Sequence, residues 1–167
     1  MKTMKLCPYV TASIIAVSLW PRPGLAASCT LSPVTTWYNT VFAGPYRLEF
    51  NRHDPHGPHP DRWLADAGFR IVQPNGKICR VSSYVAIVTL PIYIAAGRIL
   101  YIDTYSGSEN IVFAVDARTC KTLGRTPQWV GGSFLPTKYG FYIPGIGPMK
   151  LTADCRPDDW LTRPPTE

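Results

Sequence analysis

Short runs of apolar residues, separated by Pro and Gly, make up most of the chain after residue 28. In FRIVQPNGKICRV, alternating residues on both sides of Pro74-Asn75-Gly76 predict a β-hairpin, because Asn-Gly adopts positive φ at low cost. In GRILYIDTYSGSENIVFAVDARTC, the alternation predicts strands over about residues 98–105 and 110–116, joined by a turn at 106–109. These two units predict antiparallel pairing.

Other segments extend this pattern. SSYVAIVTLPIYIAA is apolar on both faces, and its β-branched residues favour a buried strand pair kinked at Pro91 over a short helix. A further hairpin is expected around residues 136–140, and PMKLTADC is expected to form a last strand. Together the segments predict an all-β fold, a small antiparallel sandwich or barrel of about seven to nine short strands.

Only one segment has helical character. In PDRWLADAG, Asp61 can cap a helix, Trp63 and Ala67 are four residues apart, and Gly68 can end the helix. One or two helical turns are expected there.

The segment IVFAVDARTCKTLGR resembles a blade hairpin of quinoprotein-type β-propellers, in which an apolar strand ends in Val-Asp before a turn that contains Thr-Gly-Lys. Residues 115–121 match this pattern, except that Cys120 stands where the glycine would be. A propeller needs at least four such blades, and the unit does not recur in the chain. The resemblance therefore implies a strand-turn-strand unit and no propeller function.

The first 28 residues have a different pattern. Lys2 and Lys5 precede an apolar run over residues 10–20, and small residues at Gly24 and Ala26, or at Ala26 and Ser28, fit a cleavage rule. We expect a cleaved secretory signal peptide, because the run is shorter than the ~20 residues that span a bilayer as a helix. A lipid anchor on Cys29 is disfavoured, since Ala26 stands where such sites usually carry Leu. Residues 29–157 then form one β-rich domain, and residues 158–167 a flexible tail in which only Trp160 is expected to be held.

Charge adds little to this picture. The formal net charge is +6, and removal of residues 1–28 takes away Lys2, Lys5 and Arg22 and no acid, which leaves +3. The remaining Lys and Arg residues are scattered along the chain. Nucleic-acid binding is therefore not expected, because it requires a clustered basic surface.

The cysteines indicate an oxidising compartment. Cys29, Cys79, Cys120 and Cys155 remain after cleavage, an even number, and two disulfides are predicted. There is no CxxC pair that would indicate a zinc ribbon or a redox centre. Of the three possible pairings, Cys29 with Cys79 and Cys120 with Cys155 is favoured because each closes a moderate loop.

The stretch NRHDPHGPHPDRW contains every histidine of the chain, His53, His56 and His59. Its prolines favour polyproline II, which rises about 3.1 Å per residue and would place successive imidazoles about 9 Å apart. Two ligands of one zinc ion each lie about 2 Å from the metal, so the loop would have to turn at Gly57 to chelate one. A solvated surface loop is favoured. The alternatives are a transition-metal site, in which such a turn brings histidines together with Asp54 or Asp61 as a further ligand, and a role in partner contact or pH sensing.

Catalytic motifs are incomplete. Ser106, Ser108 and Ser133 lack the Gly-x-Ser-x-Gly elbow of serine hydrolases. Asp103, Glu109 and Asp116 are the carboxylates close enough in sequence to be tried as a glycosidase pair, although structural roles are favoured for them. No cofactor is predicted.

A recognition surface is the remaining possibility. If Leu100, Ile102 and Thr104 face inward, alternation places Tyr101, Asp103 and Tyr105 on the opposite face of the strand. Tyrosines beside flexible turns are typical of recognition surfaces. Packing of these tyrosines on a second core face, with their hydroxyls at the rim, is nevertheless favoured over partner binding. The candidate partner-binding residues are Tyr101, Asp103, Tyr105, Ser106, Ser108, Glu109, Tyr139 and Tyr142.

These features predict an exported periplasmic or secreted binding protein, an inhibitor or immunity protein that acts on a cell-envelope hydrolase or toxin. One alternative is a metal-dependent or hydrolytic extracytoplasmic enzyme that uses the loop of His53, His56 and His59. Another alternative is a structural protein of the cell envelope.

Overall fold

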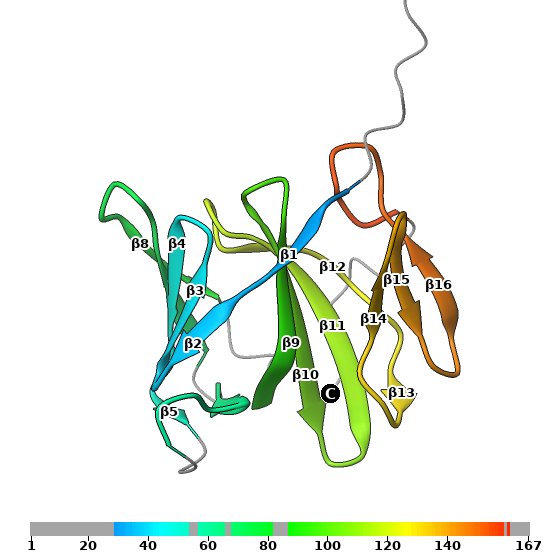
Figure 1. The fold of residues 1–167 in the computed structure, drawn as a ribbon, viewed down its shortest axis with the longest axis horizontal. Helices are drawn as coiled ribbons and strands as arrows, with labels where there is room; N and C mark the ends of the chain where they lie inside the picture. Colours follow the sequence, from blue (N-terminus) through cyan, green and yellow to red (C-terminus); the bar gives the residue numbers. More distant parts are fainter. Residues whose placement is uncertain (1–28, 54–56, 66–67, 82–86, 159, 161–167) are drawn as a thin grey trace, which may run out of the picture.

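A computed structural model describes residues 29–53, 57–65, 68–81, 87–158 and 160, and these residues contain sixteen β-strands and no helix (Figure 1). The strands form three antiparallel sheets. The predicted signal peptide, residues 1–28, lies outside the described residues.

The central sheet has eight strands in the order β12-β11-β10-β9-β6-β5, with β1 also paired to β9 and β13 to β11. Its members are β1 (Leu31–Pro33), β5 (Arg52–His53), β6 (Arg62–Leu64), β9 (Ile87–Ala95), β10 (Ile99–Ser106), β11 (Glu109–Asp116), β12 (Lys121–Arg125) and β13 (Trp129–Val130).

Two smaller sheets flank it (Figure 1). The five-stranded sheet has the order β2-β3-β4-β7-β8, and the three-stranded sheet has the order β14-β15-β16. Their members are β2 (Thr35–Trp37), β3 (Thr40–Ala43), β4 (Tyr46–Glu49), β7 (Phe69–Val72) and β8 (Ile78–Val81), and β14 (Leu135–Thr137), β15 (Gly140–Ile143) and β16 (Gly147–Lys150).

The predicted all-β, antiparallel, disulfide-stabilised fold is confirmed. The strands are more numerous than the seven to nine expected, because short pieces such as β5 and β13, of two residues each, pair separately with the central sheet. Among the described residues, no helix has the length and apolar character needed to cross a bilayer.

The central sheet is buried on both faces. Leu100 and Ile102 of β10 face a first core, which the five-stranded sheet closes with residues such as Leu48 and Ile71. Ile99 and Tyr101 of β10 face a second core, which the three-stranded sheet closes with Phe141 and Ile143. The result is a sandwich of three layers, and it explains why β9, β10 and β11 are apolar at successive positions.

The hairpins form where the sequence places them. β7 and β8 pair around the Asn75-Gly76 turn, β10 and β11 pair from Ile99 with Asp116 to Ser106 with Glu109, and β14 pairs with β15. β16 is the expected last strand, and Trp160 is buried in the second core as expected for that residue of the tail. The strand-turn-strand unit of β11 and β12 is confirmed as well.

The helix predicted in PDRWLADAG is wrong. Residues 62–64 form β6, which pairs with β9 on one side and with β5 on the other, and residues 66–67 lie outside the described part of the chain. Trp63 is fully buried, its ring stacks on Phe50 at a centroid distance of 5.2 Å, and its indole N–H donates to the Tyr38 carbonyl at 2.8 Å. Burial of the indole in the first core outweighs the weak local helix preference.

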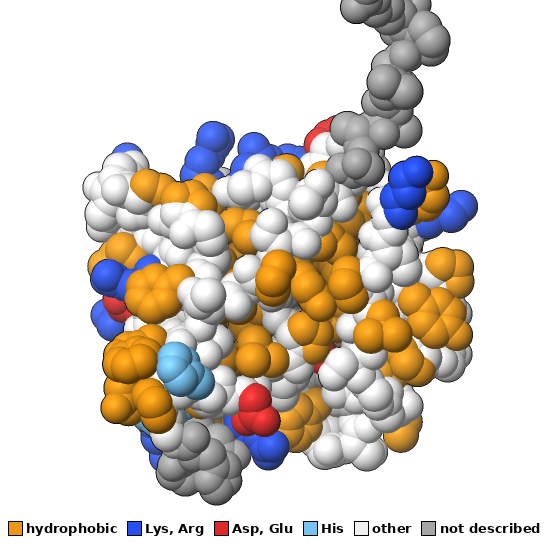
Figure 2. Space-filling view, viewed as in Figure 1, with side chains coloured by type: hydrophobic (Ala, Val, Ile, Leu, Met, Phe, Trp, Pro, Cys, Tyr) orange, Lys and Arg blue, Asp and Glu red, His pale blue; other side chains and the backbone are white. Residues whose placement is uncertain are grey.

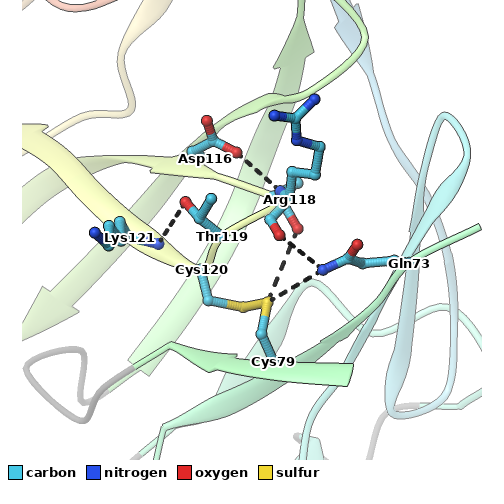
Figure 3. The surroundings of a disulfide bond; sticks show 8 residues. Gln73, Cys79, Asp116, Arg118, Thr119, Cys120 and Lys121 are labelled. Atoms are coloured by element: carbon cyan, nitrogen blue, oxygen red, sulfur yellow. Dashed lines mark hydrogen bonds between the residues drawn. A yellow bond between two sulfur atoms is a disulfide. The ribbon is translucent and has the colours of Figure 1, made fainter. Parts of the chain in front are cut away.

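The favoured disulfide pairing is also wrong. The bonds join Cys29 to Cys155 and Cys79 to Cys120, so neither of the two expected loops is closed. The strand that carries Cys79, β8, runs beside the turn that follows β11, and the disulfide joins it to Cys120 in that turn (Figure 3). Loop length was a poor guide, because the layering of the sheets decides which cysteines meet.

The turn that holds Cys120 is built from side-chain and backbone hydrogen bonds (Figure 3). Asp116 Oδ1 accepts from the Arg118 N–H at 2.9 Å, and the Asp116 carbonyl accepts from the Cys120 N–H at 2.8 Å. Cys120 has a φ of 56°, the conformation that glycine adopts most easily. The disulfide thus stands at the position where the resemblance placed a glycine.

Candidate functional site

An open pocket of about 450 Å³ lies beside the β10–β11 turn. Four strands of the central sheet, β6, β9, β10 and β11, and the turns around residues 107 and 131 contribute to its wall. Its volume falls within the range typical of ligand pockets. The lining residues are Asp61, Arg62, Thr89, Leu90, Asp103, Tyr105, Gly107, Ser108, Asn110, Gly131, Gly132 and Ser133.

An irregularity in β9 accompanies the pocket. Ile102 of β10 is opposite Ile92, but the next residue, Asp103, is opposite Thr89, so that Leu90 and Pro91 form a bulge. Proline has no N–H to donate to the next strand, and it is therefore tolerated in a sheet at such a bulge. The expected irregularity at Pro91 is confirmed, although β9 is one continuous strand and not a pair.

The bulge is fixed to the neighbouring segment and not loose. The Leu90 N–H donates to the Asp61 carbonyl at 2.9 Å, and this bond joins the bulge to the start of β6. Leu90 and Asp61 both line the pocket. This part of the pocket is consequently built on hydrogen-bonded backbone, which favours a preformed shape.

Asp103 is the most unusual polar group of the pocket. It is only 2% exposed, and its Oδ1 has no hydrogen-bond partner. Burial raises the pKa of the Asp103 carboxyl to about 7, and a hydrogen bond from the Thr104 backbone N–H opposes this effect in part. The carboxyl group therefore changes its charge close to neutral pH, a property that is common at functional sites.

The charged groups at the rim balance one another. Arg62 Nε lies 3.4 Å from Asp61 Oδ1, and both side chains are substantially exposed. Arg62, Asp61 and Asp103 are the charged side chains among the described residues that line the pocket. When Asp103 is ionised, the lining therefore carries one net negative charge, in a protein whose chain is positive overall.

Several predicted recognition residues meet in this pocket. Asp103, Tyr105 and Ser108 line it. Ser106 and Glu109 are exposed in the same turn and are paired in the β10–β11 register, but they are not part of the lining. Tyr139 and Tyr142 are also exposed, at 63% and 47%, near or on the three-stranded sheet and outside the lining.

Tyr101 is not on the surface, so it packs as the favoured core interpretation predicts and is not accessible as a partner-binding residue. Its side chain is completely buried in the second core, where its ring lies 4.7 Å from that of Phe141 and 5.6 Å from that of Trp160. Its hydroxyl donates to the Cys155 carbonyl. The second core face that was favoured for the tyrosines is thus observed for Tyr101.

The carboxylates considered as a glycosidase pair are separated along the hairpin. In the β10–β11 register Asp116 is opposite Ile99, four residues from Asp103, or about 13 Å along the strand. Asp116 also accepts from the Arg118 N–H and forms an ion pair with Arg98 at 3.3 Å. Asp116 therefore has the structural role that was favoured for it.

The histidine loop packs against the β2–β3 turn. His59 Nδ1 donates to the Thr36 carbonyl at 2.8 Å, His53 Nδ1 is hydrogen-bonded to the Asn39 side chain, and the Tyr38 N–H donates to the Pro58 carbonyl. The rings of His59 and Trp37 are in edge contact at 5.2 Å. Figure 2 shows a histidine beside the hydrophobic patch of this region, at the lower left.

Metal binding by this loop stays a prediction. His56 and Asp54 lie outside the described residues. Among the residues that are described, no three His, Cys, Asp or Glu side chains form a group that could hold a metal ion.

Nine of the twelve lining residues were not among the predicted recognition residues. Arg62, Thr89, Leu90 and the glycines at 131 and 132 come from segments that were interpreted as a helix, a buried strand and a loop. The kink at Pro91 was the available signal, because a bulge in a central strand commonly lies next to a functional site.

Comparison with known proteins gives no further assignment: no protein-family model matches the sequence, and no curated protein shows significant similarity to it.

Proposed function

We propose that this chain is an exported, periplasmic or secreted binding protein, and that it recognises another protein through the pocket beside the β10–β11 turn. The observation that carries the proposal is the buried, unpartnered carboxyl group of Asp103 in an open pocket. A buried polar atom without a partner is destabilising, and proteins tend to keep one where it serves a function.

Two further features support the proposal. The disulfides fit a protein that works outside the cytoplasm, where such bonds persist. The pocket lies at the end of a sheet that is packed on both faces, so the turns around residues 107 and 131 are mounted on a well-packed base. Recognition sites are commonly built in this way.

The partner we propose is a cell-envelope hydrolase or toxin, which this protein inhibits or neutralises. A concave site of this size admits one projecting side chain or loop tip of a partner. Exposed tyrosines near and on the three-stranded sheet, Tyr139 and Tyr142, provide additional contact area on the same molecule.

The test is affinity capture from the cell envelope of the source organism with the processed full-length protein as bait. We expect capture of one hydrolase or toxin whose activity falls on binding. A Ser108→Arg variant, which fills the pocket, is expected to lose capture, whereas Ser32→Arg, at an exposed position of β1, is expected to retain it. If the Ser108→Arg variant binds the same partner as strongly, or if the captured protein remains fully active, the proposal is wrong.

The raised pKa of Asp103 also favours one other function, an extracytoplasmic hydrolase that uses this carboxyl group as a general acid or base. Such an enzyme would turn over a substrate without a partner. Its activity would change with a pKa near 7 and would be lost in Asp103→Asn. Assays against chromogenic glycosides and esters separate the two functions, because a pure binding protein is inactive on all of them.

A further inference from the structure

We infer that the pocket binds one organic cation, a guanidinium or a primary ammonium group, with the Asp103 carboxylate as its counter-ion. The inference rests on the proposed function in one respect, because it takes the pocket as the recognition site. In the complex the cation would be an Arg or Lys side chain of the partner.

The first argument is the unmet acceptor. Asp103 Oδ1 is buried and accepts no hydrogen bond, although the side chain belongs to the lining of an open pocket. A buried carboxylate is stable when it is paired and hydrogen-bonded, so the missing partner is a donor. A ligand that enters the pocket is in a position to supply it.

The second argument is the charge of the lining. Asp61 and Arg62 are paired with each other at the rim, which leaves Asp103 as the charge inside the pocket without a counter-ion among the described lining residues. The burial that raises the pKa of Asp103 also means that its ionised form is poorly solvated. A cation gains most from such a site, because a nearby opposite charge favours the ionised carboxyl group.

The third argument concerns the kind of cation. Within the part of the chain that the structure describes, no group of three metal-ligating side chains exists, so a metal ion is not favoured. Ser108, Asn110 and Tyr105 add neutral oxygen atoms to the lining, and Leu90 adds an apolar side chain. Arginine and lysine combine a cationic donor head with an apolar stem, and this combination matches the lining.

The experiment uses the full-length processed protein and small probes in place of a partner. N-acetyl-arginine amide and N-acetyl-lysine amide are titrated by calorimetry at pH 8 and low salt, with N-acetyl-citrulline amide as the neutral isostere. We expect both cationic probes to bind at least tenfold more tightly than the citrulline probe. Asp103→Asn should weaken the binding of the cations at least tenfold, whereas Asp154→Asn, at an exposed position outside the pocket lining, should leave it unchanged.

Proton release gives an independent readout. At pH 6 most of the Asp103 carboxyl groups are protonated, so binding of a cation should release close to one proton. The release is measured from the dependence of the binding heat on the ionisation enthalpy of the buffer. It should disappear in Asp103→Asn and above pH 8.

Three results would overturn the inference. The first is a citrulline probe that binds as tightly as the arginine probe, and the second is an Asp103→Asn variant that binds the cationic probes with unchanged affinity. The third is an NMR titration that gives Asp103 a pKa below 4 which rises in Arg62→Gln, because Arg62 would then already act as the counter-ion.

A failure of the cation inference can be distinguished from a failure of the proposed function. The probes need no partner, so their binding stands even if affinity capture recovers nothing. Conversely, a captured hydrolase or toxin that binds Asp103→Asn as tightly as the original protein would refute the inference that Asp103 binds a cation of the partner. The proposed function would remain intact.

Discussion

Asp103 combines two properties that usually exclude each other, a carboxyl group and nearly complete burial. In the unfolded chain its pKa is close to 3.8, and in the folded chain burial raises the pKa to about 7. Between these values the folded protein retains a proton that the unfolded chain has lost. The free energy of unfolding therefore falls as the pH rises from about 4 to 7, by up to roughly 4 kcal/mol, and this term is constant at higher pH.

We expect Asp103→Asn to be more stable than the original protein at pH 8 and to lack this part of the pH dependence, because the amide stays neutral. Urea unfolding at intervals between pH 4 and pH 8 measures the effect. Asp61→Asn is the control, since its side chain is 67% exposed and should change stability little. A loss of stability in Asp103→Asn at pH 8 would contradict this expectation, because it would show that the ionised carboxylate has a stabilising partner in the folded protein.

Strand alternation correctly placed Tyr101, Asp103 and Tyr105 on one face of β10, but it did not show what covers that face. The three-stranded sheet covers Tyr101, and its residues 135–150 are distant in sequence. Asp103 and Tyr105, farther along the strand, line the pocket instead. A period of two assigns faces, and only the packing of another layer assigns burial.

At the level of elements, the β15–β16 pair depends on one glycine. Gly140 has a φ of 150°, and a Cβ atom at this position would lie 2.1 Å from the Met149 carbonyl oxygen. Backbone cannot yield as the end of a side chain does, so the pair would have to separate. Since this sheet closes the second core, the damage would extend to Phe141 and Trp160.

We expect Gly140→Ala to lower the free energy of unfolding by about 3 kcal/mol or more, as measured by chemical denaturation. Gly145→Ala is the matched control, because Gly145 lies in the β15–β16 turn with a φ of 80° and no atom near its missing Cβ. Its loss should be about 1 kcal/mol, the strain of the backbone alone. Equal losses in the two variants would contradict the close approach at Gly140.

Hairpins with strong turn signals were predictable as elements, whereas β6 was not. Its three residues have no β pattern of their own, and they form a strand because β9 and β5 pair with them and because Trp63 is buried. The bulge at Leu90 and Pro91 is a similar case. The proline indicated an irregularity, but its place in the middle of the central sheet depends on β10.

At the scale of the whole molecule, the disulfides join parts that are remote in sequence. Cys79–Cys120 links the five-stranded sheet to the central sheet across 41 residues, and Cys29–Cys155 links the two ends of the described chain across 126 residues. Both bonds lie beside a core, and Cys29 and Cys155 are buried in the second core.

We expect the double variant Cys79→Ala/Cys120→Ala to lose about 4 kcal/mol of stability and Cys29→Ala/Cys155→Ala about 5 kcal/mol, from the entropy that each closed loop removes from the unfolded chain. Urea midpoints of the variants measure these losses. Peptide mapping without reduction checks the pairing itself. A peptide that links Cys29 to Cys79 would refute the arrangement described above.

The sequence by itself determined the all-β class, the main hairpins and the use of four cysteines in two bonds, because these follow from local periodicity, turn residues and cysteine number. Only the tertiary structure decided the cysteine partners, the burial of Tyr101, the strand at residues 62–64 and the pocket around Asp103. Each of these depends on which surfaces meet when three sheets stack. Contacts between layers join residues tens of positions apart, and no local pattern of the chain encodes them.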